Sequence, residues 1–500
     1  MSTSGFNPIP SRDGDIAIQV ASSFPDNAAA IGIGVFQDGE LPVEVGFSRE
    51  QLTALKFDGK VGQTLYIPRP DGATLVVVGV GEAAKLTTAS LRDAAAAFGR
   101  ATSKYRQVAT DLAGVDGVSG EEGGQVVVEG VALARYFYHQ LKNGEAPTEL
   151  TDLLLVAPED RVAAVSAGAE RGKTMAAATA LARDLANTPH AYLTATRFAE
   201  LAEAIGPECN LEVETFDKAA LRELGCGGLL GVNAGSVEEP RMIKLTYRPE
   251  GDGSDSAHLA IVGKGVMYDS GGISLKPSNA SHATMKTDMS GAGATFAAMT
   301  ALAALDCPNT VTAWLMCTDN MPSGSATALG DVLTIYGGKT VEVMNTDAEG
   351  RIIMADALVL ATEEGPDAIV DISTLTGAAL MALGTRSAAV FGNNDGVVAQ
   401  LKEAAERTDE TLWQLPLDRR YRSQLDSDTA DLKNMGGEFA GAITAALFLA
   451  EFVGEVPWAH LDIAGTAHSA VEESWRTKGG TGFGARLLID LALGFTASHS

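Results

Sequence analysis

Charged side chains that could carry chemistry gather in three segments of the second half of the chain. The run VGKGVMYDSGGISLKPS begins at the end of a predicted buried strand and carries Lys264, Asp269 and Lys276. The run MKTDMSGAGA places Asp288 at the start of a stretch of small residues with helical spacing. The surrounding sequence is apolar or rich in glycine, so charges gathered in this way indicate a polar site.

The third run, NTDAEGR, carries Asp347, Glu349 and Arg351 at alternate positions before another predicted helix. In an extended segment this spacing points all three side chains to one face, on which Asp269 and Asp288 could converge from neighbouring loops. Four carboxylates packed together repel one another, which raises their pKa values unless cations neutralise them. Hard divalent cations with oxygen ligands are the natural partners of such a cluster. Two such ions could share a bridging carboxylate and activate a water molecule.

Each of these residues also has an ordinary structural interpretation. Asp288 could cap a helix, Asp347 and Arg351 could form a surface ion pair, and either lysine could be solvated. The conjunction of three such runs after predicted strands favours a carboxylate-bound divalent metal hydrolase, with the substrate left open.

These runs lie in the longer of two predicted domains. Residues 1–170 are expected to form a smaller N-terminal α/β domain that ends in a connecting helix, and residues 171–500 a larger catalytic domain. Alanine-rich sequence from Arg161 to Ala186 has helical periodicity and stops at Asn187-Thr188-Pro189, where the proline disfavours helix at the preceding residue. In the first domain we expect strands at Leu75–Gly81, Gln125–Val131 and Leu153–Ala157, and a helix at Ser90–Arg100.

The second domain alternates predicted strands with predicted helices. The strands are expected at Leu211–Glu214, Arg241–Tyr247, Leu259–Val262, Thr310–Met316, Ala368–Ile372 and Ala459–Ile463. The helices between several of them are expected at Ala292–Leu305, Ile352–Glu364 and Ala440–Val453. This order predicts the α/β class, with an α/β/α second domain around a mostly parallel central sheet. Ligands in such sheets bind at the carboxyl ends of the strands.

Composition excludes several classes of protein. The 500 residues include 64 acidic and 37 basic side chains, a formal net charge of −27, which argues against a nucleic-acid or anionic-membrane binder. No run of 18 apolar residues predicts a membrane span, and the start lacks the basic and apolar regions of a signal peptide. The 4 cysteines are widely spaced without a C-x-x-C pair, so we expect neither disulfides nor a cysteine zinc site, and a cytoplasmic location.

Three other motifs fail on inspection. Residues 79–84, GVGEAA, match G-x-G-x-x-A after a strand, but no acidic residue ends a second strand about 20 residues later, which favours a simple glycine turn. Residues 263–265, GKG, lack the upstream glycine and the following Ser or Thr of a P-loop. The sequence contains no G-x-S-x-G, which disfavours a serine hydrolase.

Several runs together resemble the leucyl aminopeptidase family of dinuclear metallopeptidases. NTDAEGR is similar to the family signature, and the likeness extends through VGKGVMYDSGGISLKPS, MKTDM, NMPSG, DISTLTGA and WAHLDIAGTA, with ARDLANTP and TGFGAR as further segments. The likeness covers roughly residues 180–490, whereas the first 170 residues are less diagnostic. Two departures, at Val266-Met267-Tyr268 and at Ala328-Leu329-Gly330-Asp331, leave every charged position of the motifs in place.

The resemblance implies two divalent metal ions per chain, Mn²⁺ or Zn²⁺, with Mg²⁺ as an alternative at one site. Asp269, Asp347 and Glu349 would hold one ion, and Lys264, Asp269, Asp288 and Glu349 the other, so that Asp269 and Glu349 bridge the pair. A lysine ligand must be neutral, so its pKa must fall far below the usual value of about 10.4, a shift that two adjacent dications could cause.

The resemblance also implies roles for other residues. Lys276 would polarise the scissile carbonyl and stabilise its oxyanion, and Arg351 would hold a bicarbonate ion that acts as general base toward the bridging water. Backbone groups around Leu375 and Gly377 would help to bind that anion or the substrate. An apolar pocket for the first side chain would be walled by Met285, Thr374 and Ala467.

The function implied is that of a cytosolic, homohexameric aminopeptidase that prefers leucine and other apolar residues at the free N-terminus of peptides. A neutral α-amine can ligate a metal, whereas an internal amide nitrogen is a poor ligand, which explains a preference for a free N-terminus. Two alternatives remain open: a catalytically silent oligomeric scaffold, and a DNA-binding accessory protein. The intact set of charged residues speaks against the first alternative, and the net charge of −27 against the second.

Overall fold

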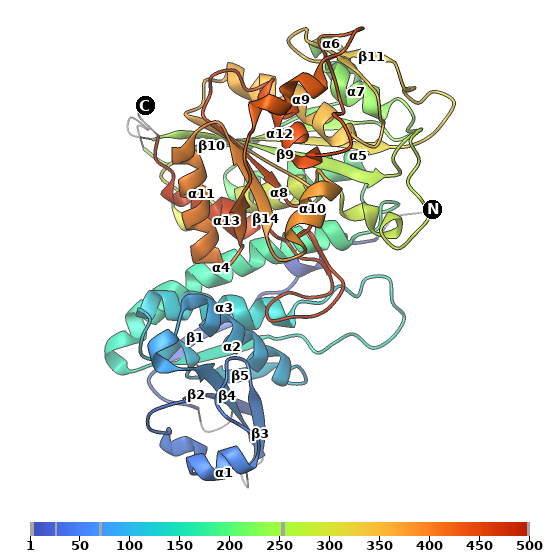
Figure 1. The fold of residues 1–500 in the computed structure, drawn as a ribbon. Helices are drawn as coiled ribbons and strands as arrows, with labels where there is room; N and C mark the ends of the chain where they lie inside the picture. The colour runs from blue at the N-terminus through green and yellow to red at the C-terminus, as the bar shows by residue number, and fades with distance from the viewer. Residues whose placement is uncertain (1–4, 26–27, 70–72, 252–255, 498–500) are drawn as a thin grey trace. The chain divides into compact units, whose positions relative to one another are not determined.

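The computed structural model of the chain describes residues 5–25, 28–69, 73–251 and 256–497. It contains two compact units, each described here by itself (Figure 1). The N-terminal unit comprises Ile9–Ala180 and Ala470–Lys478, and the C-terminal unit comprises Met1–Pro8, Leu181–Ser469 and Gly479–Ser500. The outermost residues of the two predicted domains, 1–4 and 498–500, lie outside the described residues.

A six-stranded sheet forms the centre of the N-terminal unit. In spatial order its strands are β1 (Ala17–Ala21), β6 (Asp152–Val156), β5 (Gln107–Thr110), β2 (Ala30–Phe36), β4 (Thr74–Gly81) and β3 (Thr64–Pro68). Neighbouring strands are parallel except for β3 and β4. The strands predicted at 75–81 and 153–157 are β4 and β6, and the helix predicted at 90–100 is α2 (Thr88–Ala101).

The strand predicted at Gln125–Val131 is wrong, because these residues belong to helix α3 (Gly120–Arg135). The side chains of Ser119 and Glu122 each accept the other residue's backbone N–H, a capping box that begins the helix. The helix lies beside α2 (Figure 1), and a Cβ added to Gly130 would lie 2.4 Å from a backbone oxygen of α2. A helix buried on several sides carries a continuous run of valines, which hydrophobic periodicity cannot distinguish from a buried strand.

The predicted connecting helix is α4 (Val162–Asn187), which has 26 residues. It ends directly before Thr188-Pro189, as the proline predicts. The two compact units divide between Ala180 and Leu181, within this helix, and the boundary predicted near residue 170 falls in the same helix.

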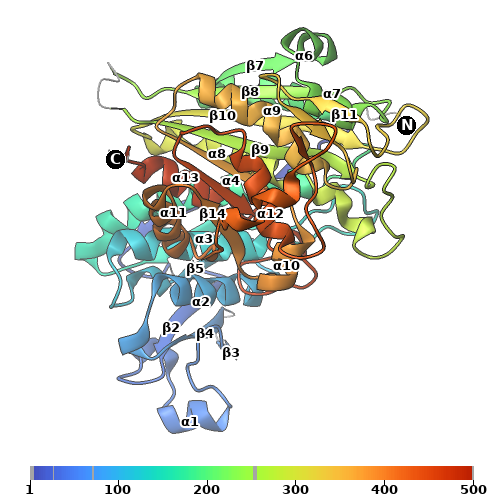
Figure 2. The same cartoon turned by 45° about the horizontal axis from the view of Figure 1, so that its top comes forward.

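The C-terminal unit is built on an eight-stranded sheet. In spatial order its strands are β15 (Leu412–Gln414), β14 (Ala388–Gly392), β17 (Trp458–Asp462), β13 (Ala368–Ser373), β9 (His258–Asp269), β10 (Thr310–Asn320), β8 (Arg241–Tyr247) and β7 (Glu212–Phe216). The four central strands, from β17 to β10, are parallel, and Figure 2 shows β10, β8 and β7 following one another to one edge. All six predicted strands lie in this sheet, which confirms the predicted α/β class with a mostly parallel central sheet.

Helices cover both faces of this sheet. The helices α8 (Ser290–Ala301) and α13 (Ala485–Gly494) pack together on one face, and α9 (Glu349–Glu363) and α12 (Gly441–Ala450) pack on the other. Among the described residues, no helix is both long and apolar enough to cross a membrane. Because the central strands are parallel, β9, β10, β13 and β17 all end at the same edge of the sheet, at Asp269, Asn320, Ser373 and Asp462.

Candidate metal centre

The charged residues from the three sequence runs meet at this edge of the sheet. Lys264 and Asp269 lie within and at the end of β9, and both are 2% exposed. Asp288 follows the 3-10 helix His282–Thr287, just before α8. Asp347 lies in the loop before α9, and Glu349 is the first residue of that helix. The structure therefore brings all five proposed metal ligands together, from two strand positions and two helix entrances.

The extended conformation predicted for NTDAEGR is wrong in its second half. Glu349 and Arg351 lie in the first turn of α9, and only the residues before Ala348 belong to the preceding loop. The acidic side chain of Glu349 is favoured at this position because the helix N-terminus carries partial positive charge.

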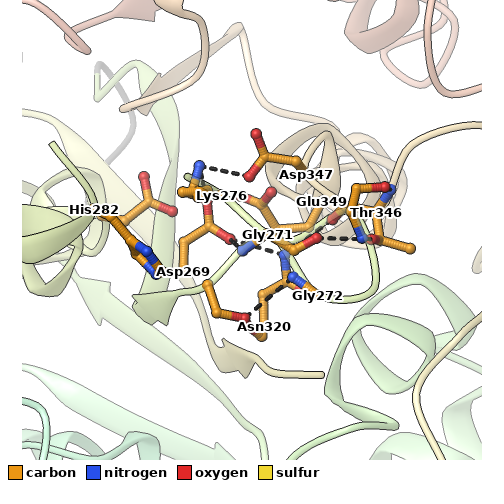
Figure 3. A network of polar contacts seen from close by, with 12 residues as sticks. Asp269, Gly271, Gly272, Lys276, His282, Asn320, Thr346, Asp347 and Glu349 are labelled. Atoms are coloured by element: carbon orange, nitrogen blue, oxygen red, sulfur yellow. Dashed lines mark hydrogen bonds and ion pairs between the residues drawn. The ribbon is translucent and has the colours of Figure 1, made fainter. Parts of the chain in front are cut away.

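Three carboxylates form the centre of the cluster (Figure 3). Ligand oxygens of Asp269, Asp347 and Glu349 all lie within 4.8 Å of one another, so that one cation could contact all three. Lys276 Nζ lies 2.7 Å from Asp269 Oδ2 and 2.5 Å from Asp347 Oδ1. These ion pairs raise the pKa of Lys276 above its usual value although burial lowers it, which keeps the side chain an ammonium ion.

The second lysine lies deeper in the cluster. Lys264 Nζ lies 2.8 Å from Asp288 Oδ2, 2.8 Å from Glu349 Oε1 and 2.9 Å from the carbonyl oxygen of Thr374. Burial lowers its pKa, but the charges of Asp288, Glu349 and Asp269 outweigh burial and raise the pKa above the usual range. Without cations the amine is therefore protonated, and it must lose this proton to become a ligand.

The four carboxylates outnumber the two lysines among them. Burial, together with the charge of Asp269, raises the pKa of Glu349 to about 8 and that of Asp288 to about 6. Glu349 Oε2 is buried and makes no hydrogen bond to any described residue. A buried carboxylate oxygen with no donor is what a cation ligand looks like in the absence of the cation, so the residues present fit divalent metal ions.

A second layer of hydrogen bonds orients Asp269. Its Oδ1 accepts the side-chain N–H of Asn320 at 2.8 Å and the backbone N–H of Gly271 at 2.8 Å. Asn320 also donates to the carbonyl oxygen of Thr346 at 2.9 Å, and Thr346 Oγ1 donates to the carbonyl oxygen of Gly271 at 2.7 Å. Gly271 has a φ of +87°, in the left-handed region that favours glycine. Asn320 lies in the run NMPSG, and nothing in that run by itself indicates that its amide orients a metal ligand.

Arg351 lies behind the carboxylates and is 7% exposed. Its Nη1 donates to the carbonyl oxygen of Asn434 at 2.9 Å, whereas its Nε is buried without a partner among the described residues. Burial lowers the pKa of Arg351 to about 10, against the opposing charges of Glu349 and Asp462, so the guanidinium stays charged near pH 7. A buried guanidinium with a free N–H suits a small oxyanion.

The proposed anion and pocket residues lie in three segments: the 3-10 helix His282–Thr287, the stretch from Thr374 to Gly377 after β13, and the turn after β17. The N–H of Leu375 donates to Asp462 Oδ1 at 3.2 Å, and Gly377 begins helix α10 (Gly377–Leu383). Thr374 Oγ1 donates to Asp288 Oδ1 at 2.7 Å, and the N–H of Asp288 donates to the carbonyl oxygen of Met285 at 3.2 Å. Ala467 lies in the turn after β17 and is 3% exposed. Thr374 and Met285 are thus hydrogen-bonded to a proposed ligand, whereas Ala467 lies after a different strand.

Comparison with known proteins identifies the family of the chain. The catalytic domain of the cytosol aminopeptidase family matches residues 180–489, and its N-terminal domain matches residues 43–145. A probable cytosol aminopeptidase of Streptomyces avermitilis is 44% identical over 461 residues, covering 88% of each chain. A second, from Alkaliphilus metalliredigens, is 40% identical over 457 residues, covering 89% of this chain and 91% of the relative.

A solved structure is similar to the chain in both fold and sequence. The bottromycin maturation enzyme BotP in complex with Mn superposes with a TM-score of 0.85 at 39% sequence identity, covering 93% of this chain and 99% of BotP. The match extends over both units of the chain, and BotP was solved with a metal of the class that the acidic cluster fits. The chain belongs to the cytosol aminopeptidase family, a family of metal-dependent aminopeptidases.

Proposed function

We propose that the protein removes N-terminal amino acids, preferentially leucine and other apolar residues, from peptides by means of two divalent cations. The observation that carries this proposal is the cluster of four buried or half-buried carboxylates around two lysines, in which Glu349 Oε2 makes no hydrogen bond to any described residue. Mn²⁺ or Zn²⁺ would bind there, with Mg²⁺ as an alternative at one site.

The chain offers two overlapping sets of ligands. Asp269, Asp347 and Glu349 would hold one ion, and Lys264, Asp269, Asp288 and Glu349 the other, which makes Asp269 and Glu349 the shared carboxylates. When bound, the ions supply Lewis-acid polarisation of the carbonyl and a water of lowered pKa. Two dications would also oppose the protonated state of Lys264, since like charges disfavour an ammonium ion.

Lys276 is the residue best placed to stabilise developing negative charge. Its side chain reaches the outer carboxylates of the cluster, is 20% exposed, and remains an ammonium ion. Cations bound to Asp269 and Asp347 would weaken the ion pairs that now hold it, freeing its N–H groups for the carbonyl oxygen of a substrate. An ammonium at that position stabilises the tetrahedral intermediate more than the planar substrate.

Arg351 would hold bicarbonate as the general base. Its unpartnered Nε and its charge provide a binding site, and the backbone N–H of Gly377 is a candidate second donor. The N–H of Leu375 is already directed at Asp462, so Leu375 would contact the substrate through its carbonyl oxygen or its side chain. Bicarbonate bound at Arg351 would supply general-base catalysis.

A free N-terminus and an apolar first residue would be selected at different points. The neutral α-amine of the substrate can approach a cation, which an acylated amine cannot do well. Met285, Thr374 and Ala467 would contact the first side chain: Met285 and Thr374 are hydrogen-bonded to Asp288, and Ala467 follows the end of β17.

The test combines metal content with hydrolysis. The purified protein, freed of metal and then supplied with Mn²⁺ or Zn²⁺, should hydrolyse leucine amide and leucyl peptides but not N-acetyl-leucine amide. A screen of aminoacyl amides would rank side chains. If the protein binds two metal equivalents but hydrolyses no aminoacyl amide, the proposed activity is refuted and the alternative of a catalytically silent scaffold is supported.

We also propose that the functional form is a cytoplasmic homohexamer with peptides, and not nucleic acid, as partners. The net charge of −27 supports the second part, because phosphate contacts need basic side chains. Light scattering would give the number of subunits, and retardation of DNA at low salt would contradict the exclusion of nucleic acid.

A further inference from the structure

Asp462 ends strand β17 within the run WAHLDIAGTA and is 1% exposed. Its Oδ1 accepts the backbone N–H groups of Leu375 at 3.2 Å, Thr376 at 3.3 Å and Ala464 at 3.2 Å. Its Oδ2 accepts the hydroxyl of Thr376 at 2.7 Å. A buried carboxylate with four donors is fully engaged, so its position and that of the donors are fixed together.

The strand register explains why this carboxylate meets that segment. Asp462 pairs with Ser373, the last residue of β13, so its side chain lies where the chain leaves the sheet toward Thr374. Thr376 Oγ1 in turn accepts the N–H of Ala379, which caps helix α10. Asp462 therefore anchors both the end of the Thr374–Thr376 segment and the helix that follows it.

The same segment contacts two of the proposed metal ligands from its other side. The carbonyl oxygen of Thr374 accepts Lys264 Nζ at 2.9 Å, and Thr374 Oγ1 donates to Asp288 Oδ1 at 2.7 Å. Asp462 is thus linked to Lys264 and Asp288 through the backbone of the Thr374–Thr376 segment, which is hydrogen-bonded to Asp462 at Leu375 and Thr376 and to the two ligands at Thr374. Both of these ligands belong to the same proposed metal site.

A second buried aspartate in the same sheet provides a contrast. Asp371, on β13, is 0% exposed and accepts His460 Nδ1 at 2.6 Å and Trp458 Nε1 at 2.7 Å. His460 and Trp458 lie parallel with their rings 6.3 Å apart, inside the strand layer. Asp371 is as buried as Asp462, but its carboxylate bonds to rings of the core and not to the Thr374–Thr376 segment.

We propose that Asp462 is a positioning residue for the metal centre: it holds the Thr374–Thr376 segment so that Lys264 and Asp288 stay in place to bind one cation. This inference rests on the proposed dinuclear function. Residues that orient metal ligands through hydrogen bonds change metal affinity by about 10–100-fold when they are replaced. Asp462 acts on the site without touching metal or substrate.

The test compares Asp462→Asn with Asp371→Asn in the full chain. The amide keeps the shape of each side chain but cannot accept at its nitrogen, so each variant loses acceptor capacity at one buried position. Calorimetric titration of the metal-free proteins with Mn²⁺ should show one binding step weakened about 10–100-fold in Asp462→Asn and changed less than about threefold in Asp371→Asn. Thermal unfolding of the metal-free proteins should show both variants destabilised.

Equal Mn²⁺ affinity in Asp462→Asn and the unchanged protein, or equal weakening by Asp371→Asn, would overturn the proposal. If Asp462→Asn fails to fold, Thr376→Val and Thr376→Ser replace it, because only serine keeps the hydroxyl that Asp462 Oδ2 accepts. Valine should weaken Mn²⁺ binding and serine should restore it. An unchanged affinity in Thr376→Val would overturn the proposal equally.

The same titrations separate this inference from the proposed function. If the unchanged protein binds no Mn²⁺, the dinuclear function itself fails. If it binds Mn²⁺ and hydrolyses leucine amide while Asp462→Asn binds equally well, only the positioning role fails.

Discussion

The two units of the chain both bury charge, but they balance it differently. In the N-terminal unit, Arg92 Nε lies 2.8 Å from Glu129 Oε2, with the side chains 0% and 1% exposed, and Gln125 donates to the other oxygen of Glu129 at 2.8 Å. In the part of the C-terminal unit that the structure describes, the two lysines Lys264 and Lys276 pair with four carboxylates, those of Asp269, Asp288, Asp347 and Glu349. Burial is shared by both places, whereas a surplus of carboxylates is found in the second.

The difference teaches that burial of an ion pair alone does not indicate a functional site. A buried carboxylate with a cationic partner and a neutral donor contributes to one folded arrangement. A buried cluster in which carboxylates outnumber lysines, and in which carboxylate pKa values are raised, lowers the stability of the folded state. Cations that bind to the cluster would raise the free energy of unfolding.

The largest expected effect comes from removing one carboxylate from each place. Glu349→Gln should lower kcat/KM for leucine amide by at least about 10³-fold, because a shared ligand of both proposed ions is lost. Glu129→Gln should leave kcat/KM of the folded protein unchanged but lower the free energy of unfolding by about 3–5 kcal/mol, since Arg92 loses a buried anionic partner. Steady-state kinetics and denaturant unfolding measure the two effects.

The same two variants also test whether the carboxylate of Glu349 is balanced less fully than that of Glu129. In the metal-free protein near pH 7, Glu349→Gln should cost less stability than Glu129→Gln, because the raised pKa of Glu349, about 8, keeps this carboxyl mostly protonated, while Asp288 still pairs with Lys264. A larger loss of stability in Glu349→Gln would show that its carboxylate is balanced as fully as Glu129.

The next effect contrasts two buried arginines. Arg135, in the N-terminal unit, is 8% exposed and donates to the carbonyl oxygens of Thr102, Tyr105 and Thr148 at 2.8–3.0 Å. Arg351 has a buried Nε without a partner among the described residues. Arg351→Ala should lower kcat by about 10²-fold, the size of a general-base contribution, with partial recovery on addition of bicarbonate.

Arg135→Ala serves as the control for that experiment. It should reduce stability, because three carbonyls lose their donor, and it should leave kcat and its response to bicarbonate unchanged. A bicarbonate response that is identical in both variants would argue against an anion site at Arg351.

Sequence reasoning found the fold and the charged cluster because both leave local patterns. The strand β4 (Thr74–Gly81) contains a continuous apolar run, and the ligands lie in runs where charges stand out among glycines. It failed for α3, where valines buried on several sides imitate a strand, and for NTDAEGR, where the helix begins earlier than the alternation suggested. Asn320 and Asp462 were missed as supporting residues because their partners come from strands and loops distant in sequence, which only the sheet register brings together.

A smaller effect concerns Asp356, a buried carboxylate whose pKa is not raised by neighbouring carboxylates. Asp356, on α9, is 0% exposed and accepts the backbone N–H groups of Leu229 and Tyr336, each at 2.8 Å. Burial raises its pKa from 3.8 to about 7, although these hydrogen bonds oppose the rise. The folded protein therefore holds a proton that the unfolded chain releases. The stability gained in this way is fully present below about pH 4 and is lost as the pH rises through 7.

Asp356→Asn should flatten this part of the pH profile. Between pH 4 and pH 7 the unchanged protein should lose roughly 1–3 kcal/mol of unfolding free energy relative to the variant, measured with metal removed. Mn²⁺ should not alter the difference between the two, because Asp356 is satisfied by N–H groups. A difference that disappears with Mn²⁺ would mean that Asp356 is coupled to the cluster, and that raised pKa values in this unit all belong to one site.

The smallest expected effect lies outside the charges, at a pair of methionines. Met285 is half-buried beside Asp288 and is proposed to contact the first side chain of the substrate, whereas Met299 is 0% exposed within α8. Met285→Ala should change the ratio of kcat/KM for leucine amide to that for alanine amide by about 3–10-fold, because apolar contacts of one or two methylenes are worth about 1–2 kcal/mol. Met299→Ala should instead cost about 2–4 kcal/mol of stability, since it leaves a cavity in the core, and should leave the ratio unchanged. A selectivity ratio that stays constant in Met285→Ala would show that this side chain does not contact the substrate. That result would not bear on the metal ligands, because Asp288 bonds to the backbone of Met285 and not to its side chain.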